Sequence, residues 1–143
     1  MSETKSPVAS KPLLWAGWVV SVLPILGLLF SGVMKLARPE AVVQGFADLG
    51  WPDQLAVPLG IVELACTVVY AIPRTAVLGA ILLTGYLGGA VAAHVRLQEP
   101  FIAPAVLGVL LWLGLLLRER RLRSLLPLRT GLVPRGQDGD REK

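Results

Sequence analysis

The sequence has few of the residues on which soluble enzymes rely. Its 143 residues include one cysteine, Cys66, and one histidine, His94. A single thiol excludes an internal disulfide and a CxxC redox motif. His94 and Glu63, a glutamate inside a long apolar run, are too few ligands for a metal site unless protomers share the site. Charged residues make up only 17% of the chain and hydrophobic residues 54%, which is the composition of a membrane protein.

Four long apolar runs lie between the charged segments. A helix needs about 20 apolar residues to cross a bilayer, and each run approaches or exceeds that length. The expected spans are Leu13 to about Leu36, Asp53 to about Ile72, about Thr75 to Val95, and about Phe101 to Leu117. We therefore predict an all-α, integral membrane four-helix bundle over residues 12–126, flanked by polar tails (1–11 and 127–143) that we expect to be disordered.

Residues 38–52 separate the first two spans and have an amphipathic pattern. Pro39 suits the first position of a helix, and Gly50 suits its end. One face carries Val42, Val43, Phe46 and Leu49. The pattern predicts a short helix lying in the membrane interface, with an ordinary connecting loop as the alternative. Asp53 is expected to cap the second span.

The distribution of basic residues predicts the orientation in the membrane. Four spans place both termini on one side, which also carries Lys11, Arg74 and the arginines after residue 117. The positive-inside rule then predicts a bacterial inner-membrane protein with both termini in the cytoplasm. No aromatic residues are interleaved with the basic ones, so the net charge of +4 does not indicate nucleic-acid binding.

Glu63 is the residue that most needs explanation, because it lies in the middle of the second span. A lone charge at that depth costs about 2.5–3.5 kcal/mol on insertion scales. Residue counting at about 1.5 Å per residue places Tyr86 near the level of Glu63, and Lys35 and His94 near the outer boundary. We expect these four residues to form a funnel open to the outside, which binds a polar head group or moves protons.

A purely structural role is the alternative for each of these residues. Glu63 could hydrogen-bond to Tyr86 or to a backbone carbonyl freed by a proline, Lys35 could extend to the surface, and His94 could be an interfacial helix-end residue. Two stripes of small residues also favour helix packing. Gly27, Ser31 and Lys35 form one stripe. Gly85, Gly89 and Ala93 form the other, either within the bundle or between the protomers of a homodimer.

Several short motifs, in order and spacing, resemble the DoxX-like family of four-span membrane proteins. They are Gly32-Val-Met-Lys35-Leu, Leu49-Gly-Trp-Pro52, Leu59-Gly-Ile-Val-Glu63 and Gly89-Ala-Val-Ala-Ala-His94-Val-Arg96. The resemblance covers about residues 13–127. It implies that the recurring polar positions of the family are Lys35, Glu63, His94 and Arg96 in this chain.

The resemblance implies fold and location more strongly than chemistry. Wider relatives include a small subunit of a thiosulfate:quinone oxidoreductase, a partner of a superoxide dismutase and a sulfurtransferase, and a chaperone of nicotinic receptors. The chain itself has no evident cofactor motif. Three hypotheses follow: a non-catalytic subunit of a quinone-linked redox system with a protein partner, a protein that binds or isomerises a small lipophile near Glu63, and a passive scaffold or assembly chaperone.

Overall fold

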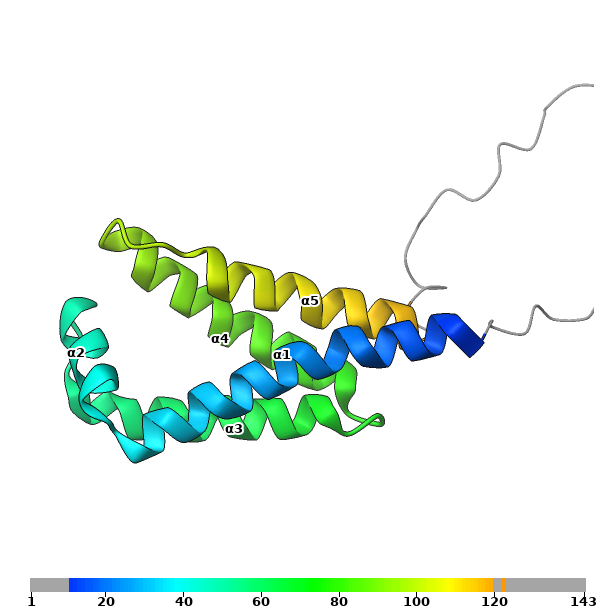
Figure 1. The fold of residues 1–143 in the computed structure, drawn as a ribbon, viewed down its shortest axis with the longest axis horizontal. Coiled ribbons are helices and arrows are strands. Elements are labelled where there is room, and N and C mark those ends of the chain that lie inside the picture. The colour runs from blue at the N-terminus through cyan, green and yellow to red at the C-terminus, as the bar shows by residue number, and fades with distance from the viewer. Residues whose placement is uncertain (1–10, 120–121, 123–143) are drawn as a thin grey trace, which may run out of the picture.

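The computed structural model describes residues 11–119 and Leu122, and this part of the chain is helical (Figure 1). Its elements are α1 (Lys11–Ala37), α2 (Glu40–Asp48), the 3-10 turn η1 (Asp53–Leu55), α3 (Ala56–Ala71), α4 (Ala76–Arg96) and α5 (Ile102–Arg118). The predicted all-α bundle with a short helix between its first two spans is confirmed. The predicted disordered tails lie almost entirely outside the described residues, although Lys11 already belongs to α1.

The four long helices form an antiparallel bundle in which each helix packs on two others. α1 lies against α3 and α5, and α4 lies against the same two helices. The start of α1 and the end of α5 meet at one end of the bundle, and α2 lies at the other (Figure 1). In the described part, three helical stretches are long and apolar enough to cross a membrane: α1, α4, and the continuous stretch formed by η1 and α3. Helix α5 is apolar but shorter.

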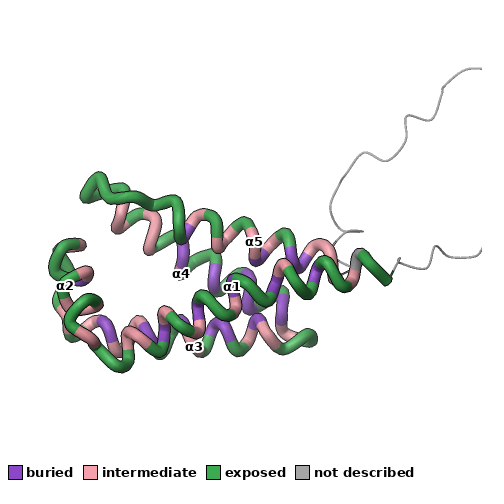
Figure 2. Tube along the Cα trace, viewed as in Figure 1, coloured by how far each residue is buried: buried purple, intermediate pink, exposed green. Residues whose placement is uncertain are grey.

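The outer surface of the bundle is apolar. Each long helix exposes large hydrophobic side chains, including Phe30, Ile61, Ile81 and Val109, while the buried residues face one another inside (Figure 2). A soluble monomer rarely exposes apolar surface on every side. Lipid is therefore the natural surrounding of these helices, because it solvates such side chains without penalty.

Close backbone contacts hold the bundle together at the end where α1 begins. A methyl group on Gly79 would lie 2.3 Å from the backbone nitrogen of Tyr70, and one on Gly114 would lie 2.3 Å from Ser21 Oγ. The fully buried Tyr70 hydroxyl donates to the carbonyl oxygen of Leu111 at 2.7 Å and lies 3.3 Å from Ser21 Oγ. α1, α3 and α5 are thus joined through one tyrosine.

The short helix α2 has the predicted position and the predicted apolar face. Phe46 is buried, and Val42, Val43 and Leu49 are half-buried. Gly50 follows the helix with φ +68°, a left-handed conformation that favours glycine and ends helices.

The predicted role of Asp53 as a helix cap is wrong. Neither η1 nor α3 has a side-chain cap, and the Asp53 carboxylate instead accepts a hydrogen bond from the Arg38 guanidinium. Arg38 lies directly after α1 and before α2 with φ +50°. The chain reversal there brings a charged donor within reach, and a charged donor is a stronger partner for a carboxylate than a backbone N–H.

Candidate functional site

The candidate site is built where α1 and α3 come into backbone contact. A methyl group on Gly60 would lie 3.0 Å from the carbonyl oxygen of Gly32 and 2.9 Å from Cβ of Lys35. A methyl group on Gly32 would lie 2.6 Å from Cγ of Leu64. Only glycine at both positions allows the two helices to approach this closely.

An ion pair spans this contact. Lys35 follows Gly32 by three residues, and Glu63 follows Gly60 by three residues. Because the two helices run antiparallel, these residues lie on opposite sides of the contact, and both side chains lean back toward it. Lys35 Nζ lies 2.7 Å from Glu63 Oε2. The Glu63 side chain is 2% exposed and the Lys35 side chain 19% exposed. The lysine charge compensates a carboxylate that would otherwise be buried without a counter-ion.

Further donors from α1 and α4 converge on the same carboxylate oxygen. The Tyr86 hydroxyl donates to Glu63 Oε2 at 3.0 Å, and Ser31 Oγ lies 3.4 Å from it. Lys35 Nζ also donates to Ser31 Oγ at 2.6 Å. Within the described residues, every hydrogen bond to this carboxylate goes to Oε2. We call Ser31, Lys35, Glu63 and Tyr86 the polar cluster.

Oε1 of Glu63 is the carboxylate oxygen to which the described residues donate no hydrogen bond. A carboxylate oxygen has two lone pairs, so Oε1 keeps the capacity to accept a proton or a hydrogen bond while three donors hold Oε2.

The structure brings together three of the five predicted site residues, Lys35, Glu63 and Tyr86. The predicted common depth of Tyr86 and Glu63 is confirmed by their hydrogen bond. His94, predicted nearer the outer boundary, lies eight residues beyond Tyr86, about 12 Å along the helix. Its Nδ1 pairs with the carbonyl oxygen of Ala90 at 2.8 Å, so it bonds within its own helix and not to the polar cluster.

Arg96 also lies apart from the polar cluster. Its Nη2 is 3.5 Å from the carbonyl oxygen of Leu49, so it joins the end of α4 to the end of α2. Ser31, by contrast, joins the cluster although sequence reasoning placed it only in a packing stripe. Its spacing of four residues from Lys35 was the available signal, because residues at i and i+4 are neighbours on a helix.

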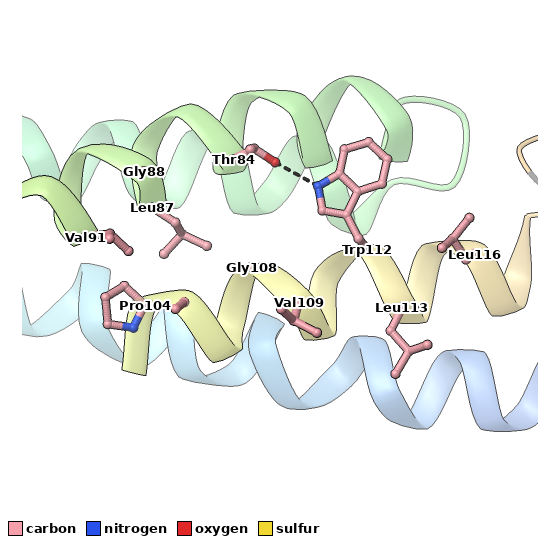
Figure 3. A pocket seen from close by; sticks show the side chains of 11 residues that line it. Thr84, Leu87, Gly88, Val91, Pro104, Gly108, Val109, Trp112, Leu113 and Leu116 are labelled. Atoms are coloured by element: carbon pink, nitrogen blue, oxygen red, sulfur yellow. Dashed lines mark hydrogen bonds between the residues drawn. The ribbon is translucent and has the colours of Figure 1, made fainter. Parts of the chain in front are cut away.

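A hollow between two helices of the described part lies away from the polar cluster. A groove of about 520 Å³ runs between α4 and α5, and none of the predicted site residues lines it (Figure 3). The described residues also contain no group of three or more His, Cys, Asp or Glu side chains placed to hold a metal ion. The chemistry available at the polar cluster is therefore hydrogen bonding and proton exchange.

Comparison with known proteins identifies the family. The model of the DoxX-like family matches residues 19–114, more than half of the chain. The chain belongs to the DoxX-like family. Neither a curated protein nor a solved structure matches this DoxX-like protein. The matched stretch contains the whole polar cluster, the Gly32–Gly60 contact and helix α2, so the resemblance noted from short motifs extends over the folded region of a multi-pass membrane protein.

The arrangement in this DoxX-like protein has a defined chemical capacity. Lys35 and Tyr86 each present a proton-bearing donor, and Glu63 links them through one oxygen. Tyr86 comes from α4, whereas the ion pair comes from α1 and α3. A movement of α4 relative to the other two helices would therefore change the hydrogen bonding of Glu63 without breaking the ion pair.

Proposed function

We propose that this protein is a non-catalytic membrane subunit of a quinone-linked redox system, and that its polar cluster receives the head group of a quinone. The observation that carries the proposal is the buried Glu63 carboxylate with Lys35 and Tyr86 on one oxygen and its other oxygen free of donors. Intramembrane ionisable groups with convergent partners are characteristic of proton and ligand sites.

The chemistry of a quinone fits these groups. Reduction of a quinone to a quinol takes two electrons, and each carbonyl oxygen takes one proton. The electrons would come from a redox partner protein. Lys35 Nζ donates two of its three protons to Ser31 and Glu63, so the third can be donated to a quinone carbonyl oxygen. The single proton of the Tyr86 hydroxyl is donated to Glu63 Oε2, so Tyr86 can donate to the quinone only by exchanging that bond. Glu63 would then pass protons to the quinone from the aqueous side. A quinone dissolves in the bilayer, so it reaches the cluster between helices without crossing water.

The test is quinone retention by purified protein. We would extract protein prepared in mild detergent with organic solvent and identify the released lipophiles by mass spectrometry. Wild type is expected to release a near-stoichiometric quinone and Glu63→Gln much less. His94→Gln is the matched control, because His94 bonds within its own helix, and it should retain the wild-type amount. Equal amounts from wild type and Glu63→Gln, or none from either, would contradict the proposal.

A passive scaffold is the second candidate, and the Gly32–Gly60 contact favours it. The ion pair lies at the tight Gly32–Gly60 contact of α1 and α3, where a specific polar contact can fix helix register. This role predicts that replacing Glu63 changes stability alone. The activity of a reconstituted redox partner, measured with Glu63→Gln at a temperature where the variant is folded, separates the two functions.

We also propose a homodimer through Gly85, Gly89 and Ala93. A methyl group added to Gly85 or Gly89 would meet nothing within 4 Å, so this stripe is not a seam within the bundle. Its small residues permit close approach of another helix. Chemical cross-linking in native membranes would show a dimer band for wild type, and Gly85→Leu/Gly89→Leu would remove it. Unchanged cross-linking in the double variant would exclude this interface.

A further inference from the structure

The groove between α4 and α5 is an elongated apolar hollow on the outside of the bundle. Its lining includes Leu87 and Gly88 of α4 and Gly108, Val109 and Trp112 of α5 (Figure 3). On α5 the lining extends from Pro104 to Leu116, twelve residues or about 18 Å along the helix. The groove therefore runs along the helix axes, in the direction that lipid chains take in a bilayer.

The groove has no free polar group to offer a ligand. Trp112 Nε1 donates to Thr84 Oγ1 at 2.8 Å, and Thr84 Oγ1 donates to the carbonyl oxygen of Ala80 at 2.7 Å. Both polar side chains that line it are thus satisfied by the protein. A ligand with a polar head would gain nothing from that head inside the groove, so the matching chemistry is a hydrocarbon chain.

The groove is continuous with the lipid-facing surface. Val109 and Leu113 line it and are 67% and 44% exposed. It lies on the opposite face of α4 from Tyr86, because Gly88 and Val91 are about 160° and 140° around the helix from that tyrosine at about 100° per residue. A molecule bound at the polar cluster therefore cannot also fill the groove without passing around α4.

The size of the groove suits a hydrocarbon chain. Its volume of about 520 Å³ lies within the ~300–1,000 Å³ of small-molecule sites. We propose that the α4–α5 groove holds one acyl chain of a bilayer phospholipid as an ordered, slowly exchanging lipid.

Two glycines provide a pair of variants for the test. Gly88 of α4 lines the groove, and Gly45 of α2 does not. A methyl group on either would meet nothing within 4 Å, so a side chain can be added at both positions without displacing the backbone. Gly88→Leu should fill the groove, whereas Gly45→Leu adds the same side chain outside the groove and outside the proposed dimer stripe.

Native mass spectrometry of full-length protein in mild detergent, after incubation with phosphatidylglycerol or phosphatidylcholine, counts the retained lipids. Wild type and Gly45→Leu should each retain one phospholipid more than Gly88→Leu. A second measurement locates the chain: in a variant with Trp112 as its only tryptophan, phospholipids brominated in the chain should quench fluorescence, and Gly88→Leu should reduce that quenching.

Each other outcome overturns the proposal in a defined way. Equal lipid retention in all three proteins would show that no ordered lipid occupies the groove. Loss of a retained quinone rather than a phospholipid in Gly88→Leu would identify an isoprenoid tail as the occupant. Loss of a dimer in Gly88→Leu would identify a second copy of the chain. Because Glu63→Gln leaves the groove intact, its lipid retention should equal that of wild type, whatever becomes of the proposed quinone site.

Discussion

Lys35 Nζ and Glu63 Oε2 lie 2.7 Å apart, and each residue comes three positions after a glycine at which α1 and α3 touch. Because α1 and α3 run antiparallel, Lys35 and Glu63 lie on opposite sides of the Gly32–Gly60 contact along the helix axes. Helical side chains lean toward the N-terminus of their own helix, so both side chains lean back over the contact and meet there. The ion pair therefore depends on the helix crossing. The glycines and the charges form one structural unit.

We expect Gly60→Ala to destabilise the protein by about 1–3 kcal/mol, as overpacking of a tight contact does. The added methyl group would lie 2.9 Å from Cβ of Lys35 and 3.0 Å from the Gly32 carbonyl oxygen, so α1 and α3 must separate. Thermal unfolding in detergent, followed by circular dichroism, measures the effect. Gly85→Ala is the control, because its methyl group meets nothing. Equal melting temperatures for the two variants would show that the contact is not tight.

The two halves of the ion pair should respond unequally to substitution. Lys35→Met leaves a carboxylate that is 2% exposed without its counter-ion, whereas Glu63→Gln leaves an ammonium that is 19% exposed and can extend to the surface. Breaking a buried pair from one side costs about 3–5 kcal/mol. Lys35→Met should approach that loss, Glu63→Gln should fall below it, and the double variant should be more stable than Lys35→Met alone. Additive losses in the double variant would show that the two charges are not coupled.

Tyr86→Phe should weaken the site while keeping its shape. It removes one donor from Glu63 Oε2, and a hydrogen bond to a charged group contributes about 1.5–3 kcal/mol. The loss should be smaller when Glu63 is already glutamine, since a neutral amide oxygen is a weaker acceptor than a carboxylate. Unfolding measurements of Tyr86→Phe, made once in the wild-type protein and once in Glu63→Gln, check this coupling. A loss of the same size in both proteins would mean that the hydroxyl contributes stability through a partner other than the Glu63 charge.

Sequence reasoning could predict the level of each residue along its span but not the direction in which its side chain points. Counting residues in antiparallel spans placed Tyr86 at the level of Glu63 and Lys35 above it, because the rise per residue is constant. It could not tell that Lys35 turns inward or that His94 bonds to Ala90, since these outcomes depend on how the helices rotate against each other. The small-residue stripe of α4 shows the same limit. Small residues permit close approach of another helix, but their spacing does not determine which helix approaches. Within the bundle, tight contacts form at other glycines, including Gly32, Gly60, Gly79 and Gly114.

The charge distribution predicts an orientation that reporter fusions can test. The described ends of α1 and α5 lie at one end of the bundle (Figure 1), the end that carries Lys11, Arg74 and Arg118. If the positive-inside rule holds, green fluorescent protein fused after residue 143 will fluoresce, and alkaline phosphatase fused there will be inactive. Alkaline phosphatase fused after Asp48, at the opposite end, should be active. The reverse pattern would place the end of the bundle that carries α2 on the cytoplasmic side.

Arg118 joins three helices at that same end, and its planar shape should matter more than its charge. Its guanidinium carbon lies 4.8 Å from the ring centroids of both Trp18 and Tyr70, and its Nη2 donates to the carbonyl oxygen of Tyr70 at 3.3 Å. A methyl group on Gly17 would lie 2.9 Å from the Arg118 backbone nitrogen, so α1 and α5 are in contact there. A guanidinium stacks on both rings, whereas a compact ammonium cannot.

We therefore expect Arg118→Lys to lower the stability by about 1–2 kcal/mol, the contribution of cation–π contacts that are partly desolvated. Arg74→Lys is the control, because Arg74 is exposed in the turn between α3 and α4 and surface changes of this kind stay within about 0.5 kcal/mol. Trp18→Leu alone should lower the stability by part of the amount that Arg118→Lys does. In a protein that already carries Arg118→Lys, the further loss from Trp18→Leu should be smaller than its loss in wild type. If Arg118→Lys has the same melting temperature as wild type, the charge alone accounts for the role of Arg118 and the stacked geometry contributes nothing.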